Sequence, residues 1–152
     1  ETFVTKKIVQ ALVRIKNKKQ KKLFLGNIYS KRDWGHAKDY VEAMWRILQQ
    51  KFPDDFVISS DKQYSIKQFI NIVSKKLNLK IKWIGKGINE KGINSEGKII
   101  IECKRKYFRP LEVDNLLGNS KKARKILKWK PKYNIHTLVE EMIAHELEMI
   151  HE

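Results

Sequence analysis

The chain has 152 residues, of which 41% are hydrophobic and 33% charged. This composition is typical of one soluble globular domain and excludes a chain that is disordered throughout. No apolar run approaches the ~20 residues that a membrane-spanning helix needs, so we expect no contact with a membrane.

The net charge of +16 comes from 33 Lys and Arg against 17 Asp and Glu. Such an excess first points to nucleic acid. The excess is mostly lysine, however, and it is spread along the chain without a zinc-finger spacing, an RNP-type aromatic motif or a KH-type GXXG loop. The pattern therefore disfavours nucleic acid as the main partner, although the surface should attract anions in general.

Cys103 is the single cysteine, so an intrachain disulfide is excluded and a cysteine-based zinc site is disfavoured. The four histidines form no HExxH motif, so we predict no bound metal. A lone cysteine suits a reducing compartment, and we expect a cytoplasmic protein.

In the first half of the chain, apolar residues at helical spacing predict a helix over 2–15. The short apolar run at 23–25 predicts a buried strand, ended by a Gly-Asn turn. A second helix is expected over 36–50, with an apolar stripe along one side. A strand is predicted at 56–58, and Ser65 with Gln68 forms a capping box that opens a third helix.

In the second half, strands are predicted over 81–84 and 98–103, on either side of a Gly- and Asn-rich loop at 85–97. A short helix is expected after Ser120, with Ile126 turned inward. Thr137 and Glu140 form a second capping box that starts the final helix. Helices and strands alternate, which indicates the α/β class, but the strands are so few and short that we expect one lobe of a larger α/β protein.

Motifs that hold a dinucleotide or perform its chemistry are missing. The nearest Gly-rich candidate, GKGINE at 85–90, has Glu90 where the third glycine should stand. None of the five tyrosines has a lysine four residues later, so the chain carries no Tyr-x-x-x-Lys pair.

Two segments concentrate polar chemistry: KRDWGHAKDY at 31–40 and KYFRPLEVD at 106–114. Each places an arginine beside aromatic residues and near an acid. Arginine offers a rigid fork of donors for phosphate, and a glutamate can accept from ribose hydroxyls. Together they fit a nucleotide diphosphate, although a helix cap around Arg32 and Asp33 and a surface cation at Arg109 remain open on pattern alone.

Four blocks, FVTKK (3–7), LGNIYSKRDWGHAKDYVEAMW (25–45), YFRPLEVD (107–114) and LKWKP (127–131), resemble the C-terminal half of the GDP-mannose 4,6-dehydratase family. This family belongs to the extended short-chain dehydrogenases/reductases. The resemblance implies that residues 1–152 form the GDP-sugar-binding lobe, and that the Rossmann domain with the cofactor and the catalytic residues lies outside this chain, upstream of Glu1.

The family is an NADP-dependent lyase. It oxidises the sugar of GDP-mannose at C4, eliminates water across C5 and C6, and returns the hydride to C6, giving GDP-4-keto-6-deoxymannose on the route to GDP-fucose. The resemblance implies NADP as the cofactor of the full-length enzyme, which should be a homo-oligomer. We expect this chain alone to be inactive, to bind NADP weakly, and to expose apolar helix faces that the rest of the enzyme would cover.

The resemblance also assigns substrate-binding residues. Val4, Thr5 and Lys7 would line the guanine pocket, with a backbone wall from Leu25, Gly26 and Asn27. Arg32 and Arg109 would meet the ribose and diphosphate, and Glu112 would accept from ribose hydroxyls. Trp34, Gly35 and His36 are expected to shape the turn into the second helix.

Two other readings remain open. The first is a different nucleotide-sugar epimerase or dehydratase, which product analysis would separate from the main hypothesis. The second is a non-enzymatic basic module, which would bind RNA with steep salt dependence and show no response to GDP.

Overall fold

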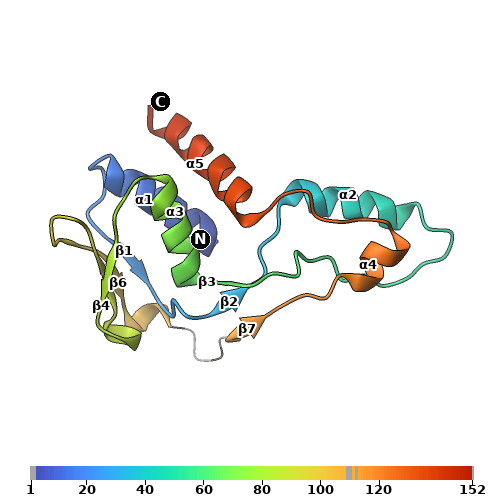
Figure 1. The fold of residues 1–152 in the computed structure, drawn as a ribbon, viewed down its shortest axis with the longest axis horizontal. Coiled ribbons are helices and arrows are strands. Elements are labelled where there is room, and N and C mark those ends of the chain that lie inside the picture. The colour runs from blue at the N-terminus through green and yellow to red at the C-terminus, as the bar shows by residue number, and fades with distance from the viewer. Residues whose placement is uncertain (1–2, 109–110, 112, 152) are drawn as a thin grey trace.

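The computed structural model describes residues 3–108, 111 and 113–151. Among these residues, a four-stranded sheet and three helices make up the larger part of the molecule (Figure 1). The strands run in the order β1-β6-β5-β4; β1 is parallel to β6, whereas β5 is antiparallel to both of its neighbours. The elements of this part are α1 (Val4–Lys16), β1 (Leu23–Leu25), α3 (Ile66–Lys76), β4 (Lys82–Ile84), β5 (Lys91–Ile93), β6 (Ile99–Cys103) and α5 (Ile135–His151), with the 3₁₀ helices η1 (Gly87–Asn89) and η2 (Arg105–Tyr107).

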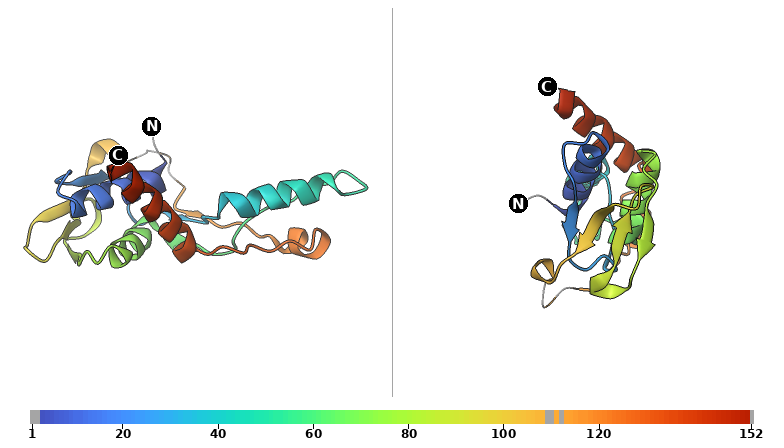
Figure 2. Two further views of the ribbon diagram at one scale, coloured as in Figure 1. Left: turned by 90° about the horizontal axis from the view of Figure 1, so that it is seen from above. Right: turned by 90° about the vertical axis from the view of Figure 1, so that its left-hand side faces the viewer.

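A smaller sheet links this part to an extended arm. Its central strand β2 (Lys31–Arg32) pairs antiparallel with β3 (Tyr64–Ser65) and parallel with β7 (Asn115–Leu116). Beyond it, α2 (Ala37–Leu48) and α4 (Lys121–Ile126) project away from the four-stranded sheet, so that the molecule is elongated (Figures 1 and 2).

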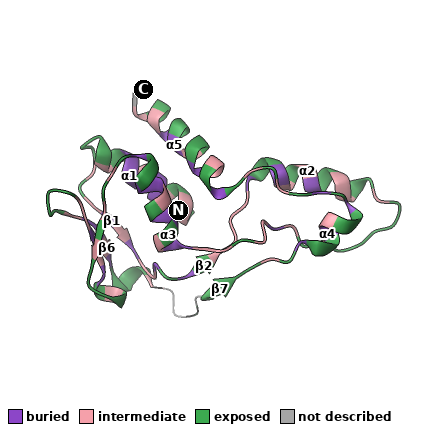
Figure 3. Ribbon diagram, in the orientation of Figure 1, coloured by how far each residue is buried: buried purple, intermediate pink, exposed green. Residues whose placement is uncertain are grey.

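The main core lies between α1, α3, α5 and the first two strands of the sheet. Leu12 of α1, Phe69 and Val73 of α3, Ile101 of β6 and Val139 of α5 are fully buried there, as the purple segments in Figure 3 show. The capping box forms as predicted: the Ser65 hydroxyl accepts from Gln68 N and the Gln68 side chain accepts from Ser65 N. This core explains why α1 and α3 form: each presents one apolar face to it.

The arm has a small core of its own, made by Ala43, Ala123, Leu127 and Trp129. The buried Asp39 carboxylate accepts hydrogen bonds from the backbone N–H of Lys132 (3.0 Å) and Tyr133 (3.1 Å). These contacts join α2 to a segment that lies more than 80 residues later in the chain.

The open side of α2 carries the apolar stripe that the sequence predicted. Met44 is 61% exposed, Trp45 62% and Leu48 80%. Among the described residues nothing covers this face, which agrees with the expectation that a lone lobe leaves apolar helix surface open.

Four local predictions are wrong. Residues 56–58 form no strand; Phe56 and Ile58 instead pack on the small core of the arm. The stretch 85–97 is not a loop, because it holds η1 and the strand β5. The strand β5 could not be predicted from alternating polarity, because its central residue Gly92 has no side chain. The position favours glycine, since a Cβ there would lie 3.1–3.2 Å from side-chain atoms of Ile81 and Ile101.

The other two errors concern the last two helices. Asn134, not Thr137, caps α5: its Oδ1 accepts from His136 N (2.8 Å) and Thr137 N (3.2 Å). The Thr137 hydroxyl accepts from Asn134 N in return, so the box sits one turn earlier than predicted. In α4, Ala123 is buried as expected but Ile126 is 45% exposed, because the short helix turns only one edge to the arm core.

Candidate functional site

The candidate site lies where the carboxyl ends of β1 and β6 meet. The parallel register pairs Leu25 with Cys103, and Lys104 N donates to Leu25 O at 2.8 Å. The chain therefore leaves both strands at the same edge, the position at which α/β sheets usually bind ligands. The first turn of α1 lies at this edge too, because α1 leads back to the start of β1 and so runs opposite to it (Figure 1).

Gly26 allows the two exit segments to touch. A Cβ at this position would lie 2.1 Å from the carbonyl oxygen of Tyr107, so only glycine fits beside η2. Leu25 is buried, whereas Gly26 and Asn27 are half-buried. Residues 25–27 thus lie at this edge, with Tyr107 packed against Gly26.

Lys7 connects α1 to the same place. Its Nζ lies 4.4 Å from the centre of the Tyr107 ring. Val4 and Thr5, in the same first turn, are half-buried. The exposed residues 104–106 add two lysines and an arginine, so this edge is cationic. It also carries the start of α1, which has no side-chain cap among the described residues; both features favour an anion.

Asn27 is linked to Tyr29 and, through Tyr29, to Glu90, which the sequence did not reveal. Its Oδ1 accepts from Tyr29 N (2.9 Å), and the Tyr29 hydroxyl donates to the carboxylate of Glu90, which is 2% exposed. The hydrogen bond with Glu90, with burial as a smaller cause, raises the pKa of Tyr29 above its usual value. Lys67 also pairs with Glu90. No local signal marks Glu90, because its partners lie 61 and 23 residues away.

Arg32 lies on β2, where pairing with both β3 and β7 fixes its backbone. Its Nη1 donates to Val113 O at 2.6 Å and to Lys31 O at 2.8 Å. Arg109 and Glu112, the other two predicted diphosphate and ribose residues, lie outside the described residues. The structure thus connects Arg32 to the 113–114 end of the predicted segment and gives no position for its partners.

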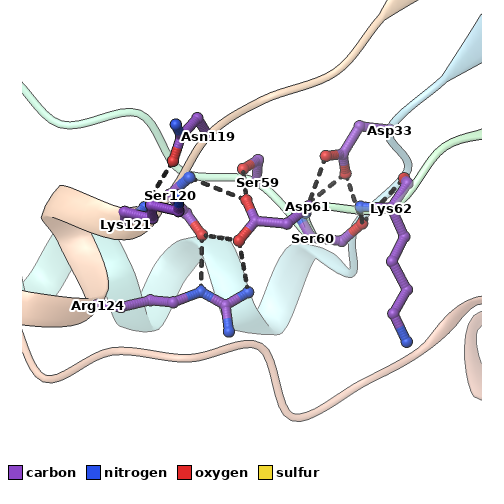
Figure 4. A network of polar contacts seen from close by, with 9 residues as sticks. All are labelled: Asp33, Ser59, Ser60, Asp61, Lys62, Asn119, Ser120, Lys121 and Arg124. Carbon is purple, nitrogen blue, oxygen red and sulfur yellow. Dashed lines mark hydrogen bonds and ion pairs between the residues drawn. The ribbon is translucent and has the colours of Figure 1, made fainter.

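Asp33 anchors the chain immediately after Arg32 (Figure 4). One of its carboxylate oxygens accepts from Ser60 N (2.9 Å) and Ser60 Oγ (2.6 Å), and the other accepts from Asp61 N (3.0 Å). Asp61 in turn accepts from Ser120 N and Oγ, both at 2.9 Å, and pairs with Arg124 at 2.9 Å. The network ties β2 to the start of α4.

The protonation of Asp61 matches this role. Burial alone would raise the pKa of its carboxyl, but hydrogen bonds from Ser59 and Ser120 and the charge of Arg124 outweigh burial and hold that pKa below its usual value. Asp61 therefore stays ionised over the physiological pH range, as the network needs.

His36 and Trp34 shape the entry into α2, as predicted. His36 is the N-cap: its Nδ1 accepts from Lys38 N at 3.1 Å, and its Nε2 contacts Glu141 at 3.0 Å. Its ring stacks on Tyr133, with centres 4.0 Å apart. Trp34 packs on Phe69 at 5.0 Å. These aromatic contacts hold the turn at the start of α2.

Two hollows lie away from this edge. One, of about 510 Å³, is lined by Asn71, Ile72, Lys75, Lys76 and His136; the other, of about 910 Å³, lies at the amino ends of β1 and β6. Neither includes a predicted substrate-binding residue. In the part of the chain that the structure describes, no group of three or more His, Cys, Asp or Glu could hold a metal ion, and no helix is long and apolar enough to cross a membrane.

Comparison with known proteins identifies related sequences. The protein-family model for GDP-mannose 4,6 dehydratase matches residues 1–142. GDP-mannose 4,6 dehydratase 2 of Caenorhabditis elegans is 47% identical, with 99% of this chain and 39% of the relative covered. GDP-mannose 4,6 dehydratase of Dictyostelium discoideum is 46% identical, covering 98% and 42%. The chain spans about two fifths of the length of the curated relatives it matches.

Solved structures show the same fold at low sequence identity. RMD from Pseudomonas aeruginosa, complexed with NADPH, superposes with a TM-score of 0.75 at 17% identity, covering 97% of this chain and 43% of that one. UDP-glucose 4-epimerase from Bifidobacterium longum, in complex with NAD⁺ and UDP, gives 0.67 at 13% identity, covering 93% and 39%. The fold is thus α/β and corresponds to part of the longer chains in this fold class.

Proposed function

This chain belongs to the GDP-mannose 4,6 dehydratase family, and we propose that it forms the lobe of such an enzyme that holds the GDP part of GDP-mannose. The complete enzyme would convert GDP-mannose to GDP-4-keto-6-deoxymannose with loss of water. The observation that carries the proposal is the meeting of Lys7, Gly26 and Tyr107 at the carboxyl edge of the parallel β1–β6 pair.

In this proposal Val4, Thr5 and Lys7 line the guanine pocket beside the wall of Leu25, Gly26 and Asn27. The cation–π contact of Lys7 holds the Tyr107 ring at the rim of this wall. Arg32, Arg109 and Glu112 keep the roles that the family resemblance gives them at the diphosphate and ribose. Two arginines suit a diphosphate, since charge-assisted hydrogen bonds are about twice as strong as neutral ones.

NADP would be held by the part of the enzyme outside this chain, and when bound it would supply the hydride chemistry. The residues of this chain do not form an NADP-binding motif. GKGINE runs from the end of β4 through η1 to the start of β5, not from a strand into an α-helix, and its Glu90 is used by Tyr29 and Lys67.

The same outer part would cover the open face of α2. Trp45 and Leu48 are exposed although they are large and apolar. This chain matches 39% of the Caenorhabditis elegans relative, so about three fifths of that relative lies outside the match. A domain packed on this face would bury the apolar stripe of α2. The complete enzyme would be a cytoplasmic homo-oligomer; the single buried Cys103 suits a reducing compartment.

Calorimetric titration of the 152-residue chain with GDP and with UDP tests the proposal. We expect GDP to bind more tightly than UDP, and Asn27→Ala to weaken GDP binding. Incubation with GDP-mannose and NADP⁺ should give no 4-keto product, because the Tyr-x-x-x-Lys pair is missing. Equal binding of UDP would favour another nucleotide-sugar enzyme. Turnover by the chain alone would overturn the proposal that this lobe holds the substrate while the catalytic residues lie outside it.

A further inference from the structure

A lysine-lined groove lies at the end of the four-stranded sheet that is opposite to the candidate substrate site. It has a volume of about 910 Å³. It is formed by the segment after α1, the segment after α3 and the turn between β5 and β6, at the left-hand end of the molecule in Figure 1. The lining residues are Ile15, Lys16, Lys18, Gln20, Lys21, Lys22, Asn78, Leu79, Lys80, Asn94, Ser95, Glu96, Lys98, Ile99 and Ile100.

Six of these fifteen lining residues are lysines, and the fold brings them together from three separate segments. Glu96 is the one acid among them, and it is already paired with Lys98 at 2.8 Å. Lys22 pairs with Glu102 at 3.4 Å. Within residues 3–108, 111 and 113–151, Lys16, Lys21 and Lys80 form no ion pair, so the groove keeps an uncompensated positive charge that attracts anions.

The remaining lining residues indicate how a ligand would be recognised. Ile15, Leu79, Ile99 and Ile100 supply apolar surface, on which lysine stems can lie while their ammonium groups reach outward. None of the fifteen is aromatic or an arginine. The groove therefore has no stacking platform for a base and no guanidinium fork for bidentate recognition, and it would recognise charge alone.

We propose that this groove binds single-stranded nucleic acid through its phosphate backbone, without reading the bases. A groove of this volume is much larger than one phosphate, and three separate segments contribute lysines to it, which suits a chain of phosphodiesters rather than a single anion. The site is independent of the proposed function, because none of its residues belongs to the GDP-binding edge.

Fluorescence anisotropy with labelled (dT)15 tests the proposal on the 152-residue chain. The groove variant carries Lys16→Gln, Lys18→Gln, Lys21→Gln and Lys80→Gln. The matched control carries Lys62→Gln, Lys121→Gln, Lys125→Gln and Lys130→Gln, four exposed lysines of the arm and its base, and so loses the same charge. Circular dichroism and thermal melting establish that both variants are folded.

We expect the groove variant to lose at least ~10-fold in affinity near 100 mM salt, and the slope of log K against log salt to shrink by about 3, at ~0.7 per phosphate contact. The control should change less than ~3-fold, and GDP binding should be unchanged in the groove variant. Equal losses of (dT)15 affinity in the two variants would overturn the site, because net charge and not the groove would then determine binding. Competition by polyglutamate as strong as that by unlabelled (dT)15 would overturn the assignment to nucleic acid.

Discussion

The ammonium nitrogen of Lys7 lies 4.4 Å from the centre of the Tyr107 ring, so the first turn of α1 touches η2 across the carboxyl edge of the sheet. More than 90 residues separate the two side chains. Because Tyr107 also packs against Gly26, this contact brings together the predicted substrate-binding segments 3–7, 25–27 and 106–108.

Replacing Lys7 by glutamine tests this surface. Because a cation–π contact at a partly exposed site contributes about 0.5–1 kcal/mol, we expect only that small loss in the free energy of unfolding. GDP affinity should fall by roughly 3–10-fold, since Lys7 lines the proposed guanine pocket and its charge-assisted hydrogen bonds would also be lost. Lys6→Gln, at the exposed neighbouring position, serves as the control in calorimetric titration, and equal losses in both variants would contradict a specific role for Lys7.

Gly26→Ala should disturb the same edge from the other side. The new Cβ would lie 2.1 Å from the Tyr107 carbonyl oxygen, so the backbone of one exit segment must move. We expect a loss of roughly 1–3 kcal/mol in urea unfolding, together with weaker GDP binding. Gly87→Asn is the control, because Gly87 has open space around it and Asn tolerates its φ of +58°. Wild-type stability in the Gly26 variant would show that η2 does not pack as described.

Asp61→Asn should change the response to acid. The pKa of the Asp61 carboxyl is lower in the folded chain than the ~3.9 of an unfolded one, so the unfolded state takes up its proton first as pH falls. Its contribution is therefore present above about pH 4 and is lost below it.

The asparagine variant lacks this contribution at every pH, and asparagine accepts the φ of +60° at this position. We expect a loss of about 1–2 kcal/mol near pH 7 that shrinks toward pH 3, measured by urea unfolding across pH. Asp55→Asn, at an exposed position, is the comparison. If the difference in the free energy of unfolding between the wild-type chain and the Asp61 variant stays constant down to pH 3, the charge of Asp61 does not stabilise the network.

Trp45→Gln combined with Leu48→Gln should reduce self-association of the chain without destabilising it. Both side chains are more than 60% exposed, so they contribute little to the arm core and much to apolar surface. Light scattering and thermal melting measure the two effects. Ala43→Gln on the buried side of α2 provides the contrast, with an expected loss of about 1–3 kcal/mol. Unchanged association in the double variant would mean that another surface is responsible.

Apolar periodicity was sufficient to predict α1, α3, β1 and β6, because each presents a repeated apolar face to the main core. It also predicted α2, although the apolar stripe of α2 is largely exposed and only Asp39 and Ala43 of this helix are buried. It failed at β5, where Gly92 gives no side chain to read, and at 56–58, where an apolar run packs on a core without pairing with a strand. The Asn134 cap was missed because two overlapping boxes share Thr137, and only the hydrogen-bond geometry distinguishes them.

At the candidate site, sequence reasoning could name Lys7, Gly26 and Arg32 but not the contacts that hold them. The sequence placed Glu90 in a Gly- and Asn-rich loop, yet Glu90 is 2% exposed and binds Tyr29 and Lys67. The lysine groove was also invisible, because its lysines look dispersed until β1, β6 and the ends of α1 and α3 are placed side by side. In each case the missing information is long-range pairing.

The bond from Trp129 Nε1 to Asp39 O, 2.9 Å long, spans 90 residues. The arm is thus closed by contacts of high sequence separation, and such contacts form slowly because a long loop must first be ordered. On the ribosome, α2 would emerge well before its partners around Trp129, at ~5–20 residues per second. For several seconds its apolar stripe would lack even the small core beneath it, which makes this helix the segment most in need of a chaperone during synthesis.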